Sequence, residues 1–129
     1  MTTLATLAAD HDVTFDALTQ DAEVPVLTGP QAQGDLIVLP IPTAKPGQPI
    51  PATGEVLLVG RGGNAHTLYG TGYWTPATGG RQDLGCLVVP EGGTAWLLHR
   101  EHGGNGIGPG AYLIRRQREQ ADEARLLAD

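Results

Sequence analysis

The chain has 129 residues, which suffices for one domain with a single modest core. Glycine (19) and proline (10) together exceed a fifth of the residues, which favours short strands joined by tight turns and disfavours long helices. The net charge of −6 arises in residues 1–60, which hold seven acids and one base, and the sequence lacks a broad basic face, so it disfavours nucleic-acid binding.

Residues 1–23 predict an N-terminal arm or a short helix. Within them, Thr14–Leu18 favours one or two helical turns capped by Asp12 or Thr14. The chain does not begin with a basic region followed by an apolar stretch, so we expect no signal peptide and a cytoplasmic location. We also expect no membrane partner, because no apolar run reaches the ~18 residues that a membrane-spanning helix needs.

The middle of the chain predicts short strands separated by turns. Val24–Leu27 contains a proline and is expected at a sheet edge. Leu36–Leu39 is apolar on both faces, which is typical of a buried strand, and Val56–Val59 is expected as a second strand. A further strand is expected over Ala65–Tyr69, and residues 70–80 are expected to form turns and loops.

The last part of the chain predicts three more strands and a helix. Leu84–Val89 and Thr94–His99 are expected to pair as a hairpin over a tight turn. Ala111–Arg116 is expected as the last strand, with Tyr112 and Ile114 on one face. Residues 117–127 have apolar side chains near helical spacing and predict a short helix.

Together these elements predict a mostly-β domain over residues 24–129. We expect a single-domain sandwich, barrel or β-clip of six to seven short strands, with short helical segments at both ends. The helical tail over residues 117–127 is included in that domain.

Three histidines suggest a metal site. His99 and His102 are three residues apart, with Glu101 between them, and a regular strand would point the two histidines to opposite faces. They can meet only if the chain turns between Arg100 and Gly103. His66 follows another glycine turn, and hairpin pairing could also bring it near His99. Three neutral imidazoles form a suitable set of ligands for zinc or another divalent cation; otherwise these histidines are ordinary strand-end and loop residues.

Other chemistry has little support in the sequence. Cys86 is the only cysteine, which excludes an intrachain disulfide and a cysteine-based zinc site, and the chain has no serine. The glycine-rich stretch Asn105–Gly110 lacks the strand–loop–helix setting of a phosphate-binding loop. The sequence therefore contains no complete catalytic set.

Arginines are clustered at the end of the last expected strand. Arg115, Arg116 and Arg118 are flanked by acidic residues. We expect them to form ion pairs with the acidic first half of the chain, within one subunit or across a subunit boundary, or to bind an anionic partner.

Three segments, GDLIVLPIP, GEVLLVGRGGNAHTL and HREHGGNGIGPGAYLIRRQRE, carry a resemblance to a known group of proteins. The chain resembles small proteins from actinobacteria and their mobile elements with the pattern GDVxxxPV, GExTGHxHxx and HxEHxPIxLPPGxYxVxRQREY. The resemblance covers residues 34–120. The first histidine of the GHxH element is Asn64 here, and the final tyrosine is Gln120.

These observations favour a non-catalytic structural or protein-interaction module that forms homo-oligomers or binds a protein partner and needs no cofactor. The alternative is a metal-binding protein or metal-dependent enzyme centred on His66, His99 and His102.

Overall fold

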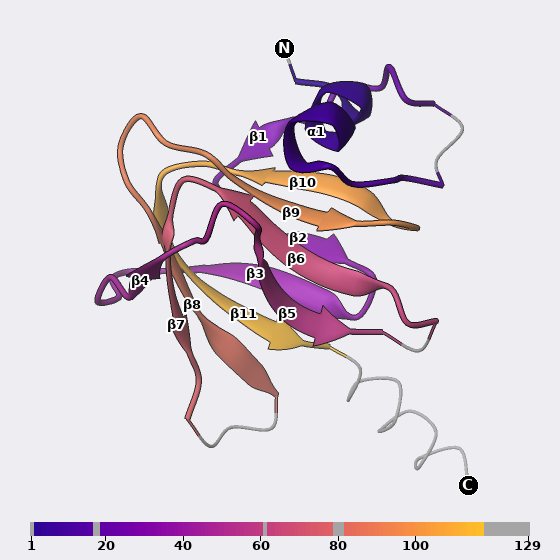
Figure 1. Cartoon of the computed structure of the whole chain (residues 1–129). Coiled ribbons are helices and arrows are strands. Elements are labelled where there is room, and N and C mark those ends of the chain that lie inside the picture. The colour runs from indigo at the N-terminus through magenta and orange to yellow at the C-terminus, as the bar shows by residue number, and fades with distance from the viewer. Residues whose placement is uncertain (1, 17–18, 61, 79–81, 118–129) are drawn as a thin grey trace, which may run out of the picture.

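The computed structural model describes residues 2–16, 19–60, 62–78 and 82–117. Within these residues the chain forms one helix, α1 (Leu4–His11), and eleven strands that make two packed sheets (Figure 1). The structure confirms the predicted mostly-β single domain, and of the three predicted architectures it shows the sandwich. The described helix is too short to span a membrane.

The two sheets are mainly antiparallel. The five-stranded sheet has the order β1 (Val26–Leu27), β10 (Gly103–Ile107), β9 (Ala95–His99), β6 (Ala65–Gly70) and β5 (Glu55–Val59). The six-stranded sheet has the order β2 (Gln31–Gln33), β3 (Leu36–Ile41), β11 (Gly110–Arg116), β8 (Asp83–Val89), β7 (Tyr73–Pro76) and β4 (Gln48–Pro49). Only β1 and β10 pair in parallel among the described strands.

More strands are present than the six or seven expected. The edge strand β1 lies within the predicted Val24–Leu27. The unexpected strands β2 and β4 have three and two residues, too few for a visible alternation of apolar and polar residues. Two further strands lie where turns and loops were expected, β7 within residues 70–80 and β10 in the glycine-rich stretch after His102. Pairing with neighbouring strands overrides the weak local propensity there.

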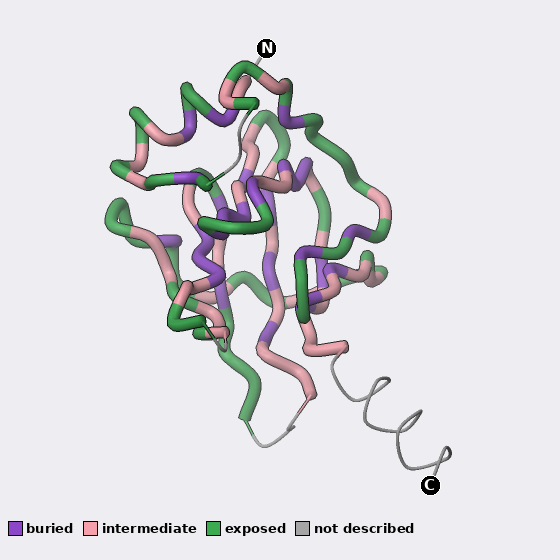
Figure 2. Tube along the Cα trace, turned by 90° about the vertical axis from the view of Figure 1, so that its right-hand side faces the viewer, coloured by how far each residue is buried: buried purple, intermediate pink, exposed green. Residues whose placement is uncertain are grey.

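The core lies between the two sheets, and buried residues alternate with less buried ones along strands such as β3, β8 and β11. Figure 2 shows the distribution of buried residues along the chain. On β11, Tyr112 and Ile114 are buried on one face, as predicted, and Leu113 between them is half-buried. The Tyr112 hydroxyl donates to the carbonyl of Gly108 (2.7 Å), which ties the β10–β11 loop to the core. The main core cluster consists of Leu36, Val38, Ile50, Leu68, Trp74, Leu87, Val89, Ala95, Leu97, Ile107, Tyr112 and Ile114.

The predicted hairpin between residues 84–89 and 94–99 is wrong. The strand β8 pairs with β11 and β7, and β9 pairs with β10 and β6 in the other sheet. The chain crosses from one sheet to the other at the turn where Gly93 N donates to the carbonyl of Pro90. Because of this crossing, Leu87 and Leu97 enter the same core from facing sheets.

The N-terminal helix lies earlier than predicted. The α1 helix begins after Thr3, whose hydroxyl accepts from the Thr6 amide, and ends at Asp12 in a left-handed conformation. Leu4 and Leu7 lie on its buried face, and this favours the helix at that position. Residues 14–16 are not helical, so the predicted turns over Thr14–Leu18 are wrong for these residues. The predicted C-terminal helix lies outside the described residues, except for Gln117.

Candidate histidine site

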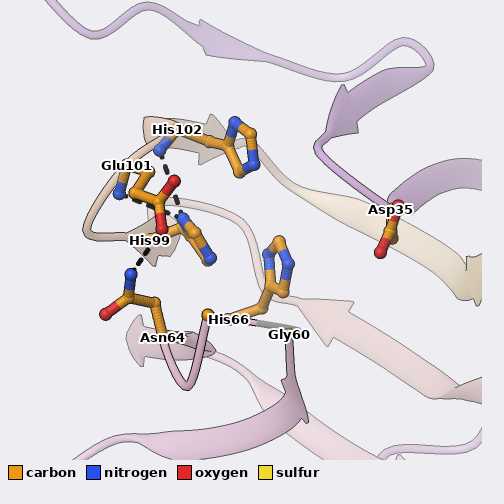
Figure 3. Close-up of a pocket in the computed structure, with 8 residues that line it drawn as sticks. Asp35, Gly60, Asn64, His66, His99, Glu101 and His102 are labelled. Atoms are coloured by element: carbon orange, nitrogen blue, oxygen red, sulfur yellow. Dashed lines mark hydrogen bonds between the residues drawn. The ribbon is translucent and has the colours of Figure 1, made fainter.

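A polar pocket lies where three turns meet at one end of the sandwich (Figure 3). The turns join β2 to β3, β5 to β6, and β9 to β10, and they lie on the right in Figure 1. We call this feature the histidine pocket; its volume is about 190 Å³. Its lining residues are Asp35, Gly60, Gly62, Asn64, His66, His99, Glu101 and His102.

The three predicted histidines converge in this pocket. The ring centroids are 4.3 Å apart for His66 and His99, 4.6 Å for His99 and His102, and 6.2 Å for His66 and His102. Pairing of β6 with β9 brings His66 beside His99, because Thr67 and Leu98 are register partners. The predicted turn after His99 is present over Arg100–His102, which we call the histidine turn. It returns His102 to the same pocket.

A buried glutamine fixes the orientation of the His66 ring. Gln33 is 3% exposed, and its Nε2 donates to the carbonyl of Leu97 (2.7 Å) and to Asn105 Oδ1 (2.9 Å). Gln33 Oε1 is therefore the atom that faces His66 Nδ1, at 2.9 Å. Since a carbonyl oxygen only accepts, His66 carries its proton on Nδ1, and its Nε2 lone pair has no partner among the described residues.

His66 is held in its neutral form. Burial, together with the neighbouring imidazoles of His99 and His102, lowers its pKa from 6.5 to about 4, against the opposing effect of the Asp35 carboxylate. With 2% of its surface exposed, the ring has little contact with water that could stabilise a charge. At neutral pH the pocket therefore contains an uncharged nitrogen base whose lone pair is available.

His99 has a different role, because two backbone amides occupy the lone pair of its Nδ1. The amides of Glu101 and His102 donate to this nitrogen, at 3.1 and 3.2 Å, so the proton of the neutral ring is on Nε2. Burial and His102 lower the pKa of His99, while Glu101 and the backbone of Asn64 raise it. In this arrangement His99 organises the histidine turn and has no free lone pair.

His102 lies at the exposed rim of the pocket. Its imidazole makes no hydrogen bond within the part of the chain that the structure describes, so it can rotate at low cost. Gly34 leaves space for it: a Cβ atom there would lie 2.8 Å from Cδ2 and Nε2 of His102 and 3.3 Å from Cε1 of His66. Gly34 also has a φ of +56°, which favours glycine over other residues.

Two carboxylates contribute negative charge to the pocket. Asp35 follows Gly34 directly and opposes the lowering of the His66 pKa, as a nearby anion does. Glu101 accepts a hydrogen bond from Asn64 Nδ2, which links the turn between β5 and β6 to the histidine turn. Figure 3 shows Asp35 across the pocket from Glu101 and Asn64.

The sequence indicated part of this site. It identified the three histidines and Glu101, but it did not identify Gln33 or Asp35. The feature that could have pointed to Gln33 and Asp35 is the polar run Gln33-Gly34-Asp35, which comes directly before the strand β3. The predicted metal role of His99 conflicts with its hydrogen bonds. No three His, Cys, Asp or Glu side chains in the described ranges are already arranged to hold a metal ion.

The predicted arginine cluster lies away from this pocket. Arg115 and Arg116 end β11, and Arg118 lies outside the described residues. Arg115 pairs with Asp83 (3.4 Å) on the neighbouring strand β8, so its partner is not in the acidic first half of the chain. Both side chains are about 40% exposed, so the pair stabilises the fold only slightly. Cys86 is half-buried on β8.

Fold and pocket together define a small β-sandwich protein in which three imidazoles meet at one end. The chain belongs to the family described as Domain of unknown function (DUF8820), which matches residues 32–117. No curated protein and no solved structure matches the chain. The matched range includes every residue that lines the histidine pocket and begins after α1 and β1.

Proposed function

We propose that this protein binds a divalent transition-metal ion such as zinc in the histidine pocket, and that it does so in the cytoplasm. The observation that carries the proposal is the Gln33–His66 hydrogen bond, which leaves the His66 Nε2 lone pair directed away from its anchoring partner. Metal-binding histidines commonly donate their other ring proton to a carbonyl or carboxylate oxygen, which sets the tautomer and orients the ring.

The proposed ligands are His66 Nε2, the His102 imidazole and the Asp35 carboxylate. Two imidazoles and one carboxylate suit zinc and related divalent ions. His66 needs no deprotonation at neutral pH, because its pKa is about 4, so protons compete weakly with a metal there. Binding requires rotation of the exposed His102 side chain toward His66, at a cost of about 1 kcal/mol in rotamer freedom.

Titration of metal-free protein with zinc, followed by calorimetry, tests this proposal. We expect one bound ion per chain, loss of binding in His66→Ala, and binding at least about tenfold weaker in His102→Ala. The matched control is His11→Ala, because His11 lies on α1 against the Tyr69 ring, outside the pocket lining. A wild-type protein that takes up no zinc, or a His66→Ala variant that binds as well as the wild type, would overturn it.

His99→Ala separates a ligand from a residue that organises the turn. We expect this variant to unfold more easily, by about 1–3 kcal/mol, because the Glu101 and His102 amides lose their acceptor. Urea unfolding of the metal-free protein measures that loss. Unchanged metal-free stability combined with complete loss of zinc binding would instead assign His99 as a direct ligand.

We also propose that the protein acts as an interaction module that self-associates through β5. Supporting this, β5 is an outer strand of its sheet, and Val56 and Val59 are 54% and 58% exposed. The β5–β6 register shifts between Val56 and Leu58, and such an edge irregularity disfavours continuous backbone pairing. A second copy would therefore cover the two valines mainly through side-chain contacts.

Light scattering of the full chain at about 50 µM tests self-association. We expect a dimer or larger species in the wild type and a monomer in Val56→Lys/Val59→Lys. The control is Val26→Lys, which places a charge at an exposed valine on the opposite edge of the same sheet. A monomeric wild type, or identical masses for all three proteins, would refute an interface at β5.

A further inference from the structure

The histidine turn is bordered on its outer side by a segment that lies outside the matched family range. Residues 2–16 and 19–25, here called the N-terminal segment, precede the range 32–117. In Figure 1 this segment lies over β9 and β10 of the five-stranded sheet. The turn that carries His102 is therefore located between the histidine pocket and the N-terminal segment.

Apolar contacts attach the N-terminal segment beside the turn. Leu7 and Leu98 are each 1% exposed and belong to one apolar cluster, and Leu98 directly precedes His99 on β9. A Cβ atom at Gly104 would lie 3.4 Å from a Leu7 methyl group, so the glycine permits the helix to approach the strand closely. The cluster consists of Leu4, Leu7, Phe15, Val24 and Leu98, with Ala8, Val13, Tyr69 and Trp96 packed against it.

Polar contacts hold the turn itself. The Asp16 amide donates to the carbonyl of Arg100 (2.9 Å), and Arg100 Nε donates to Asp16 Oδ1 (2.9 Å). Arg100 is the first residue of the histidine turn, between His99 and Glu101. Because both side chains are about half exposed, the ion pair adds little stability alone, whereas the backbone hydrogen bond fixes the position of the turn.

The turn has open space on the same side. A second pocket of about 220 Å³ separates Glu101–Gly104 from Leu4 and Ala22–Pro25. His102 and Glu101 line both this pocket and the histidine pocket. The histidine turn therefore separates the histidine pocket from this second pocket. The hydrogen bonds at Arg100 and the packing of Leu7 limit the movement of the turn toward the N-terminal segment.

We propose that the N-terminal segment is a clamp that positions the histidine turn, and that closure of the clamp and occupancy of the histidine pocket favour each other. The second part rests on the proposed metal-binding function. A metal ion bound to His102 restrains the turn from one side, and the clamp restrains it from the other. Linkage then requires that each event strengthens the other by the same factor.

Hydrogen exchange of the whole chain, followed by mass spectrometry, tests the clamp without metal. We expect exchange of the Glu101 and His102 amides to accelerate about fivefold or more in Leu7→Ala, and less in Asp16→Ala, with no change in β3 and β11. Leu84→Ala is the control for Leu7→Ala, because Leu84 packs against the main core instead. Asp10→Ala is the control for Asp16→Ala, because Asp10 is an exposed acid of α1.

Zinc supplies the second part of the experiment. We expect zinc to slow exchange across residues 2–16, and Leu7→Ala to bind zinc about three- to tenfold more weakly than Leu84→Ala. If the wild type binds no zinc, metal binding and the coupling both fail, while the metal-free data still decide whether the turn is clamped. The clamp is refuted if zinc binds but does not change the exchange rates of residues 2–16, and if the exchange rates of the turn are the same in each variant and its control. Should Leu7→Ala fail to fold, the milder pair Leu7→Val and Leu84→Val gives the same comparison.

Discussion

Replacing Gly34 with alanine is expected to weaken zinc binding at least about tenfold. The added methyl group would lie 2.8 Å from Cδ2 and Nε2 of His102 and 3.3 Å from Cε1 of His66, so it would displace one proposed ligand and crowd the other. The left-handed backbone at Gly34 adds about 1 kcal/mol of strain, which lowers the melting temperature as well. Calorimetric zinc titration and thermal unfolding measure the two effects separately.

Gly63→Ala is the matched control for Gly34→Ala. Gly63 also lies in a turn at the pocket end of the sandwich, with a φ of +82°, but a Cβ atom there would have no neighbour within 4 Å. We therefore expect similar backbone strain and unchanged zinc affinity. If the two alanine variants lose the same amount of affinity, obstruction of the histidine pocket is not the cause, and the ligand assignment of His102 is wrong.

Replacing Asn64 with histidine is expected to strengthen zinc binding by about tenfold or more. Asn64 lines the histidine pocket and now donates to Glu101, so a histidine at this position would bring an additional imidazole to the metal. A tenfold gain corresponds to about 1.4 kcal/mol of binding free energy.

Competition with a chromophoric chelator resolves this gain even when wild-type affinity is already high. Asn64→Ala is the control, because it removes the amide–carboxylate hydrogen bond without adding a ligand. Adding His66→Ala to Asn64→His should abolish the gain, since the new imidazole is expected to act together with His66. Equal affinities for the histidine and alanine variants at position 64 would refute the arrangement.

Features of the histidine pocket that follow from local rules were predictable from the sequence. Gly103 and Gly104 permit a turn directly after His99, and this is how His102 returns to the same pocket as His99. The proximity of His66 and His99 was also predicted, but through a hairpin. In the structure β6 and β9 pair although β7 and β8 come between them along the chain, so this part of the site depends on the topology of the whole sandwich.

Features that depend on long-range packing were not predictable. The three-residue strand β2 gives no pattern of its own, yet its Gln33 reaches across to Leu97 in the other sheet and orients His66. The hairpin error has a related cause, because a strand–turn–strand pattern is the same whether the second strand pairs with the first or crosses to the facing sheet. Only the completed core distinguishes the two.

The alternation of the chain between the sheets affects how the protein folds. Successive segments enter the five- and six-stranded sheets in turn: β1, then β2 to β4, then β5 and β6, then β7 and β8, then β9 and β10, then β11. Neither sheet can be completed before the other, because each contains strands from both the early and the late parts of the chain. Such topology slows folding and makes it strongly cooperative, with few stable intermediates. Gln33 comes from the six-stranded sheet, whereas His66 and His99 come from the five-stranded sheet, so the proximity of these side chains reports that the two sheets have come together.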